Sequence, residues 1–224
     1  MAIDRWMVQQ QQAGTPPILR LYRWSAPALS LGRHQQRWPD HWRRLQAEGR
    51  LELVRRPSGG RAVLHAGELT YALAMRPVQR QREAVYRHCC LWLQQAFAAA
   101  GEPLVFGQAA AAAAAQRSSC FATATPADLI GLDGSKRIGS AQLWQGPALL
   151  QHGSVLLDPP RDLWRELFGA DPPALPSLTW QGDELDQRLR AAAQHHLCGG
   201  TLLDQPLSAA EWAAVRELEP LGAL

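Results

Sequence analysis

LELVRRPSGGRAVLHAGELTYALAM, residues 51–75 of the chain, decides the fold because it alternates strand patterns with turn residues. Leu51–Arg55 alternates apolar and polar side chains, and two further runs rich in strand-forming residues lie around Ala62–His65 and Thr70–Met75. The short connection Ala66-Gly67-Glu68 predicts a hairpin between these last two runs. The stretch therefore predicts three strands, with a loop of small and basic residues after the first.

Short strands and amphipathic helices continue on both sides of this stretch. Further strands are predicted at Ile18–Tyr22, Ala28–Leu31, Asp128–Leu132, Lys136–Trp144 and Ala148–Leu157. Helices are predicted at Ile3–Gln12, Arg82–Ala100, from Leu163 to Phe168, at Asp183–Leu197, and after Ser208, which begins a capping-box pattern. Many short strands followed by helices predict an α+β fold, with mixed β-sheets flanked by helices.

The length of 224 residues favours a single hydrophobic core. A proline-interrupted segment, Asp171–Pro176, is typical of a linker. We therefore expect a main domain at residues 1–170 and a short helical extension at residues 171–224 that packs on the same domain.

Composition excludes several classes of function. A net charge of +3, without any block of like charges, does not indicate nucleic-acid binding. The chain shows neither a signal peptide nor an uncharged apolar run of about 18 residues, so we expect no contact with a membrane. The four cysteines lack metal-binding spacing, and free thiols fit a reducing compartment. We expect a cytoplasmic protein without a metal site.

The helix predicted at Arg82–Ala100 carries one apolar stripe, which includes Cys89 and Trp92. The stripe predicts that Cys89 lies in the core, and that Cys90 beside it serves packing as well. The seven alanines at 109–115 are compatible with a helix or with a surface segment.

The first segment suited to chemistry is Arg55–His65. Its paired glycines, Gly59 and Gly60, allow the backbone to approach a ligand closely, and their N–H groups can face an anion. The flanking arginines offer charge-assisted donors. The alternative is a basic turn with solvated arginines.

Two further segments combine polar and small residues. Lys136, the single lysine of the chain, opens a strand that continues through Gly139, Ser140 and Ala141. A lysine near an acyl carbonyl can stabilise negative charge that develops on oxygen, whereas the alternative is one exposed cation at a turn. His152 and Gly153 interrupt an otherwise apolar strand, which suggests a ligand against the sheet, although a lone histidine there can be structural.

Taken in order, these segments resemble the biotin/lipoate protein ligase superfamily. Its lipoate ligases and octanoyltransferases carry Arg-Arg-x-[Ser/Thr]-Gly-Gly, then Gly-x-Lys-x-x-Gly-Ser-Ala-Gln, then Gln-His-Gly-Ser, and residues 1–160 match this order. The resemblance implies a ligase-like catalytic domain and acyl transfer to a carrier lysine. Arg61 occupies the place of a third glycine found in ligases, which favours the transferase branch.

The resemblance also assigns roles to residues. Cys120, which precedes Lys136 by 16 positions, matches the nucleophile of the cysteine-dependent octanoyltransferases, and Lys136 would orient and polarise the acyl carbonyl. The implied substrate-binding residues are Arg56, Ser58, Gly59, Gly60, His65, Gly139, Ser140, Ala141, His152 and Gly153. We expect Lys136 to occupy a position outside the core.

The expected reaction moves octanoyl from acyl carrier protein, through a cysteine thioester, to a lipoyl-domain protein such as glycine cleavage H protein or the E2 subunit of a 2-oxoacid dehydrogenase. It requires no cofactor. One alternative is an ATP-dependent lipoate ligase, which uses ATP with Mg²⁺ and in which Cys120 is a small buried residue. Another is a non-catalytic relative that only binds carrier proteins. The sequence leaves the acyl chain and the acceptor protein open.

Overall fold

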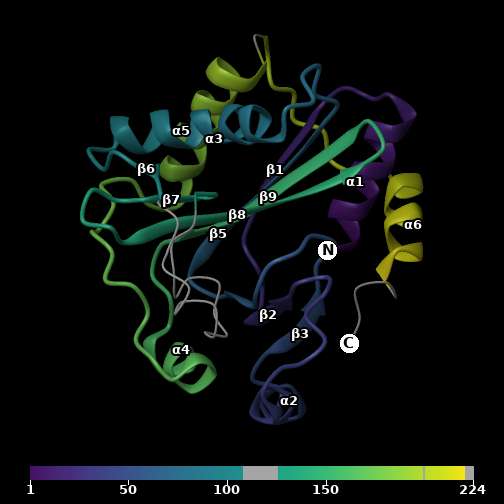
Figure 1. Cartoon of the computed structure of the whole chain (residues 1–224). Helices are drawn as coiled ribbons and strands as arrows, with labels where there is room; N and C mark the ends of the chain where they lie inside the picture. Colours follow the sequence, from purple (N-terminus) through teal and green to yellow (C-terminus); the bar gives the residue numbers. More distant parts are fainter. Residues whose placement is uncertain (108–125, 199, 220–224) are drawn as a thin grey trace.

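The computed structural model describes residues 1–107, 126–198 and 200–219. They form a large sheet and a small sheet, with helices packed around both (Figure 1). The predicted α+β fold, with mixed sheets flanked by helices, is confirmed. The alanine run at 109–115 and Cys120 lie outside the described residues.

The large sheet has six strands in the order β1-β5-β9-β8-β7-β6, and every neighbouring pair is antiparallel. Its strands are β1 (Ile18–Tyr22), β5 (Glu68–Met75), β6 (Val105–Phe106), β7 (Asp128–Ile130), β8 (Lys136–Gln145) and β9 (Ala148–Leu156). In the centre of the sheet, Thr70 lies opposite Ser154, which lies opposite Gly139. Two predicted segments of the site, on β8 and β9, are therefore direct neighbours.

The small sheet brings the third segment to the same place. Strand β2 (Ala28–Leu31) runs parallel to β3 (Glu52–Arg55) and antiparallel to β4 (Val63–His65). Residues 56–62, which hold the paired glycines, connect β3 to β4. The loop therefore lies at the end of the small sheet formed by Leu31, Arg55 and Val63.

The predicted hairpin between the runs at Ala62–His65 and Thr70–Met75 is wrong. Strand β4 pairs with β2 in the small sheet, whereas β5 pairs with β1 and β9 in the large sheet. Gly67, with φ +65°, turns the chain between the sheets, and a Cβ atom there would lie 1.8 Å from the carbonyl oxygen of Asp158. Gly67 is therefore needed for a crossover that packs against another backbone segment, and not for a tight hairpin turn.

Helices cover the sheets as their apolar patterns predict. They are α1 (Ala2–Ala13), α2 (Asp40–Ala47), α3 (Arg82–Ala99), α4 (Arg161–Phe168), α5 (Gly182–Ala193) and α6 (Ala209–Glu217), and α5 continues into the π-helical turn η3 (Gln194–Cys198). Helices α3 and α5 share a core with the large sheet, α1 and α6 share a second core with it, and α2 and α4 enclose the small sheet (Figure 1). Cys89, Cys90 and Trp92 are fully buried, as the stripe on α3 predicts.

The segment after residue 170 packs on the rest of the chain. Helix α5 contacts α3, and α6 contacts α1. The buried guanidinium of Arg137 on β8 donates to the carbonyl oxygen of Pro176 and forms an ion pair with Glu102. The capping box at Ser208 and Glu211 is confirmed. The helix predicted at Asp183–Leu197 changes at Gln194 to a π-helical turn, and the boundary at residue 170 stays a prediction.

Candidate active site

A cavity of about 330 Å³ lies between the glycine-containing loop and the face of the large sheet formed by β5, β8 and β9. All predicted substrate-binding residues except Ser58 line it. Its lining residues are Met1, Ser30, Arg56, Gly59, Gly60, Val63, His65, Thr70, Gly139, Ser140, Ala141, Gln142, His152, Gly153 and Ser154. The structure therefore brings segments almost 100 residues apart in sequence to one site. The buried hydroxyl of Ser154, one of the lining residues, has no hydrogen-bond partner among the described residues.

Arg56 builds the loop at this cavity. Its side chain is buried and donates to the carbonyl oxygens of Ser30 at 2.9 Å, Gly59 at 2.8 Å and Arg61 at 2.6 Å. The solvated basic turn considered from the sequence is therefore wrong for Arg56. Its donors hold the loop carbonyls inward, so the nearby backbone N–H groups keep a fixed direction.

The two glycines of the loop serve different purposes. Gly60 has φ +96°, and a Cβ atom there would lie 2.7 Å from the guanidinium of Arg56. The carbonyl of Gly60 also lies so close to Gly32 that a side chain on Gly32 would overlap it. Gly59 adopts an ordinary conformation, and a Cβ atom there would meet nothing within 4 Å. Gly60 is therefore required by the backbone, whereas Gly59 leaves open space at the cavity wall.

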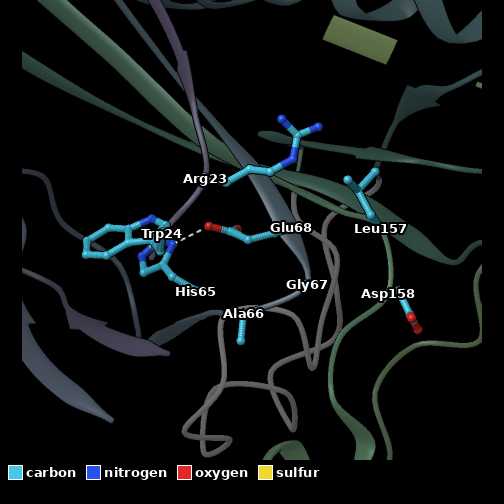
Figure 2. Close-up of a pocket in the computed structure, with 8 residues that line it drawn as sticks. All are labelled: Arg23, Trp24, His65, Ala66, Gly67, Glu68, Leu157 and Asp158. Atoms are coloured by element: carbon cyan, nitrogen blue, oxygen red, sulfur yellow. Dashed lines mark hydrogen bonds and ion pairs between the residues drawn. The ribbon is translucent and has the colours of Figure 1, made fainter. Parts of the chain in front are cut away.

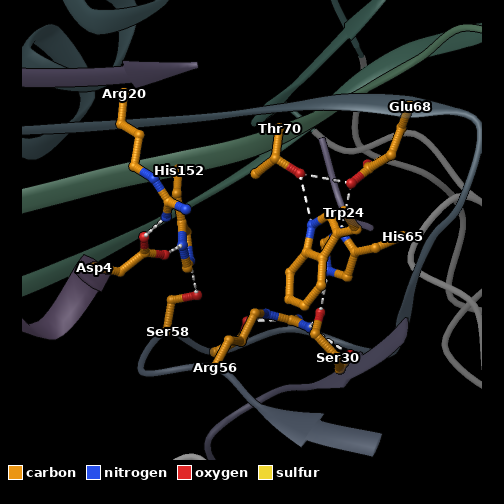
Figure 3. Close-up of polar contacts among 11 residues, drawn as sticks. Asp4, Arg20, Trp24, Ser30, Arg56, Ser58, His65, Glu68, Thr70 and His152 are labelled. Carbon is orange, nitrogen blue, oxygen red and sulfur yellow. Dashed lines mark hydrogen bonds and ion pairs between the residues drawn. The ribbon is translucent and has the colours of Figure 1, made fainter. Parts of the chain in front are cut away.

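His152 lies in a buried polar chain with Asp4 and Ser58 (Figure 3). Its Nδ1 lies 2.8 Å from Asp4 Oδ2, and its Nε2 lies 2.5 Å from Ser58 Oγ. Burial alone would raise the pKa of Asp4, but the hydrogen bond and charge of His152, with the charges of the N-terminus and Arg20, lower it below its ordinary value. Asp4 is therefore a carboxylate that accepts from His152 Nδ1 and orients the imidazole ring, with Nε2 directed at the hydroxyl of Ser58.

His65 forms a second chain of the same composition. Its Nδ1 lies 2.5 Å from Glu68 Oε1, and its Nε2 lies 2.7 Å from Ser30 Oγ (Figure 3). Thr70 also donates to Glu68 Oε1, at 2.6 Å, and accepts from the indole nitrogen of Trp24. Two buried serine–histidine–carboxylate chains therefore border one cavity.

Lys136 occupies a different environment from the one expected. Its side chain is only 3% exposed, and its Nζ lies 2.9 Å from Asp128 Oδ1. The expectation of a position outside the core is wrong, because a neighbouring strand supplies a carboxylate to the lysine. Lys136 is not among the described residues that line the cavity. Its predicted relation to Cys120 concerns a residue outside the described part of the chain.

Two other cysteines are unsuited to nucleophilic chemistry. Cys89 and Cys90 are fully buried, and burial raises the pKa of each thiol to about 12. A thiol of this kind is almost entirely protonated near neutral pH, and the thiolate is the reactive form. Both act as core residues, as predicted.

Packing against neighbouring side chains requires glycine at position 153, which the sequence pattern does not reveal. A Cβ atom there would lie 2.6 Å from the Tyr71 ring and 2.6 Å from Ser140 Oγ, and these two side chains hydrogen-bond at 2.7 Å. The space beside Gly153 on that face of the sheet is thus filled by protein side chains. The glycine permits this packing, while its backbone contributes to the cavity wall on the other side.

A second cavity, of about 300 Å³, adjoins the first at His65, which lines both (Figure 2). Its other lining residues are Arg23, Trp24, Ala66, Gly67, Glu68, Leu157 and Asp158. Sequence reasoning missed this cavity and missed Ser30, Asp4 and Glu68. Glu68 stands three positions after His65 and could have been noticed, whereas nothing in the local sequence indicates Asp4.

Comparisons with known proteins agree with this arrangement. Residues 1–172 match the family model of the lipoyl protein ligase A/B catalytic domain. Octanoyltransferase LipM of Moorella thermoacetica is 35% identical over 206 residues, which cover 89% of this chain and 71% of that protein.

Two solved structures share the fold. The bi-partite lipoate protein ligase of Thermoplasma acidophilum superposes with a TM-score of 0.74 at 17% identity, covering 98% of this chain and 86% of that one. Lipoate-protein ligase A bound with ATP gives a TM-score of 0.75 at 18% identity, covering 98% and 87%. The resemblance seen in the three motifs is confirmed: this chain belongs to the lipoyl protein ligase A/B catalytic domain family.

Proposed function

We propose that this chain is an octanoyltransferase of lipoate biosynthesis. It moves octanoyl from the thioester of acyl carrier protein to Cys120 and then to a lysine of a lipoyl-domain protein. The observation that carries the proposal is the meeting of the three family segments at one cavity in a chain 35% identical to a LipM octanoyltransferase.

The first cavity, which we call the acyl cavity, suits a neutral acyl chain. Much of its wall consists of glycine, alanine and backbone at Gly59, Gly139 and Ala141, which leaves room for methylene groups. The bound polar end would meet hydroxyl and N–H donors, in the manner of ligand sites that combine apolar walls with a few placed polar groups.

Cys120 is the proposed acyl acceptor because thioester exchange between thiols needs no activation by a nucleotide. The high thiol pKa of Cys89 and Cys90 removes these two residues as candidates. Lys136 is proposed to stabilise negative charge on the carbonyl oxygen, with Asp128 fixing its position.

The proposed partners are acyl carrier protein as donor and a lipoyl-domain protein as acceptor. The Thermoplasma ligase that shares the fold was studied with its E2 lipoyl domain, which supports an acceptor of this type. No described helix is long and apolar enough to cross a membrane. A cytoplasmic location remains our prediction.

An ATP-dependent lipoate ligase is the second candidate, favoured by the fold shared with a ligase bound to ATP. In that case free lipoate and ATP would modify the carrier, and Cys120 would be dispensable. A non-catalytic relative would modify nothing.

The test is the intact mass of the protein after incubation with octanoyl-acyl carrier protein in the absence of ATP. We expect one octanoyl adduct on the wild type and on Cys198→Ala, and none on Cys120→Ser, because an unassisted serine hydroxyl is a poor nucleophile. Modification of a lipoyl domain by free lipoate and ATP, retained in Cys120→Ala, would establish the ligase instead.

A further inference from the structure

The second cavity is anionic, although the chain carries a net charge of +3. Its lining includes the acidic residues Glu68 and Asp158 and the basic residue Arg23 (Figure 2). Arg23 is already neutralised by Asp186, with two hydrogen bonds of 2.7 and 2.9 Å. The lining thus holds two acidic residues that Arg23 does not compensate, and the cavity suits a cationic group.

Glu68 lines this cavity and carries one buried oxygen without a hydrogen-bond partner among the described residues. Its Oε1 accepts from His65 and Thr70, whereas its buried Oε2 has no hydrogen-bond partner among the described residues. A buried carboxylate oxygen is costly to leave unpaired, and an ammonium group can give it a charge-assisted hydrogen bond. The Trp24 ring, which also lines the cavity, adds a surface on which an ammonium and its methylene groups can lie.

The hydrogen bonds of His65 determine which of its ring nitrogens donates and which accepts. Thr70 donates to the Glu68 carboxylate, and His65 Nδ1–H donates to the same oxygen. His65 Nε2 therefore carries the lone pair and accepts from the hydroxyl of Ser30, which lines the acyl cavity. The imidazole can take up a proton at Nε2, on the side that faces the acyl cavity. The Trp24 ring stacks on it, with the ring centroids 4.5 Å apart, and fixes the orientation of the imidazole plane.

We propose that the second cavity receives the lysine side chain of the acceptor protein, and that His65, positioned by Glu68, removes the proton that this lysine must lose. This inference rests on the proposed function. The lysine ammonium would approach Glu68 Oε2 beside Trp24 and reach the acyl cavity at His65, the residue that the two cavities share.

The proton balance is complete without a cofactor. The lysine ammonium gives one proton to His65 Nε2, directly or through the Ser30 hydroxyl, which passes its own proton on and is replenished. The neutral amine attacks the thioester carbon, the carbon–sulfur bond breaks, and its electron pair stays on the cysteine sulfur. The second amine proton goes to that thiolate, and His65 later releases its proton to solvent. Amide, thiol and one released proton result.

The experiment separates the two half-reactions in the full chain. Wild type, Glu68→Gln and Glu166→Gln are loaded with octanoyl from acyl carrier protein, and decay of the acyl-enzyme is followed with a lipoyl domain or with hydroxylamine. Hydroxylamine is unprotonated at neutral pH and needs no base. Glu166 is an exposed carboxylate paired with Arg50 and serves as the matched control.

We expect loading and the hydroxylamine reaction to stay within about twofold in Glu68→Gln, while transfer to the lipoyl domain falls about tenfold to 100-fold, the range of a positioned base. Glu166→Gln should match the wild type throughout. Asp158→Asn, a change at an exposed residue of the same cavity, should raise the KM for the lipoyl domain several-fold and leave loading unchanged.

Contrary outcomes are distinct. Equal losses with both nucleophiles in Glu68→Gln, or full transfer to the lipoyl domain, would overturn the role of His65 and Glu68. An unchanged KM in Asp158→Asn would overturn the entry of lysine through this cavity. A wild type that never forms the acyl-enzyme would instead overturn the proposed function, and this inference with it.

Discussion

The carboxylate of Asp4 lies 2.8 Å from Nδ1 of His152, although 148 positions separate them in the chain. The contact attaches helix α1 to strand β9 of the large sheet, at a residue that lines the acyl cavity. It also orients the ring of His152, whose Nε2 lies 2.5 Å from Ser58 Oγ. A residue near the start of the chain thus orders the loop that forms the opposite wall of the site.

Asp4→Asn should lower the free energy of unfolding at neutral pH by about 1–3 kcal/mol, because a buried charge-assisted hydrogen bond is lost. The pKa of Asp4 is lowered from its ordinary value of 3.8 in the folded protein. Its contribution is therefore complete above that value and disappears as pH falls through the folded pKa. Urea unfolding at neutral pH and at about pH 3 should show a smaller difference between variant and wild type in acid. An equal difference at both values would exclude this account.

Much of the fold follows from local pattern. The strands at Ile18–Tyr22 and Ala28–Leu31 have the predicted bounds, and the helix predicted at Arg82–Ala100 ends one residue early. The helix buries one regular stripe, so its period identifies it, whereas the two strands are short runs of strand-forming residues bounded by turn residues. The three segments of the site could be found because each combines small and polar residues within a short stretch of sequence.

Other features depend on contacts between distant segments. The hairpin predicted at Ala66-Gly67-Glu68 is wrong because β4 pairs with β2 and β5 pairs with β9, in different sheets. Local sequence patterns do not reveal these partners. The burial of Lys136 depends on Asp128, which comes from a neighbouring strand of the sheet. Partners of this kind require the folded chain.

The paired glycines offer a matched test of the loop. Gly60→Ala should cost about 1–2 kcal/mol of unfolding free energy, since a side chain at φ +96° is strained. Gly59→Ala should leave stability within about 0.5 kcal/mol, because its methyl group enters open space. We expect Gly59→Ala nevertheless to lower kcat/KM for acyl transfer by narrowing the cavity. Melting curves and transfer rates measured side by side check both, and an unaffected rate in Gly59→Ala would place the acyl chain elsewhere.

The buried thiols predict a response to alkali. Burial raises the pKa of Cys89 and Cys90 from 9.0 to about 12. Between these values the folded protein binds more protons than the unfolded chain, so these thiols lower stability as pH rises. Cys90→Ala should therefore lose less stability than the wild type between about pH 9 and pH 11.

In a Cys120→Ala/Cys198→Ala background, native protein should resist iodoacetamide at about pH 8 and react after unfolding. Fast native alkylation would show that the two thiols are accessible.

The ion pair between Lys136 and Asp128 allows the catalytic role of the lysine to be tested separately from its structural role. Lys136→Ala should lower the free energy of unfolding by about 3–5 kcal/mol, because it removes the cation from a buried carboxylate. Lys136→Arg keeps the charge but not the compact ammonium, so acyl-enzyme formation should fall nearly as far as in Lys136→Ala, by roughly 100- to 1,000-fold, the cost of one oxyanion donor.

The double variant Asp128→Ala/Lys136→Ala distinguishes the two effects. Removing both charges relieves the buried carboxylate, so we expect it to regain a large part of the lost stability while acyl-enzyme formation stays as slow as in Lys136→Ala. The measurements are urea unfolding and single-turnover acylation by octanoyl-acyl carrier protein. If the double variant recovered its acylation rate together with its stability, Lys136 would act only by holding the fold. Near-full activity in Lys136→Arg would mean that a diffuse positive charge suffices, and the lysine would then lose its place as the group that polarises the carbonyl.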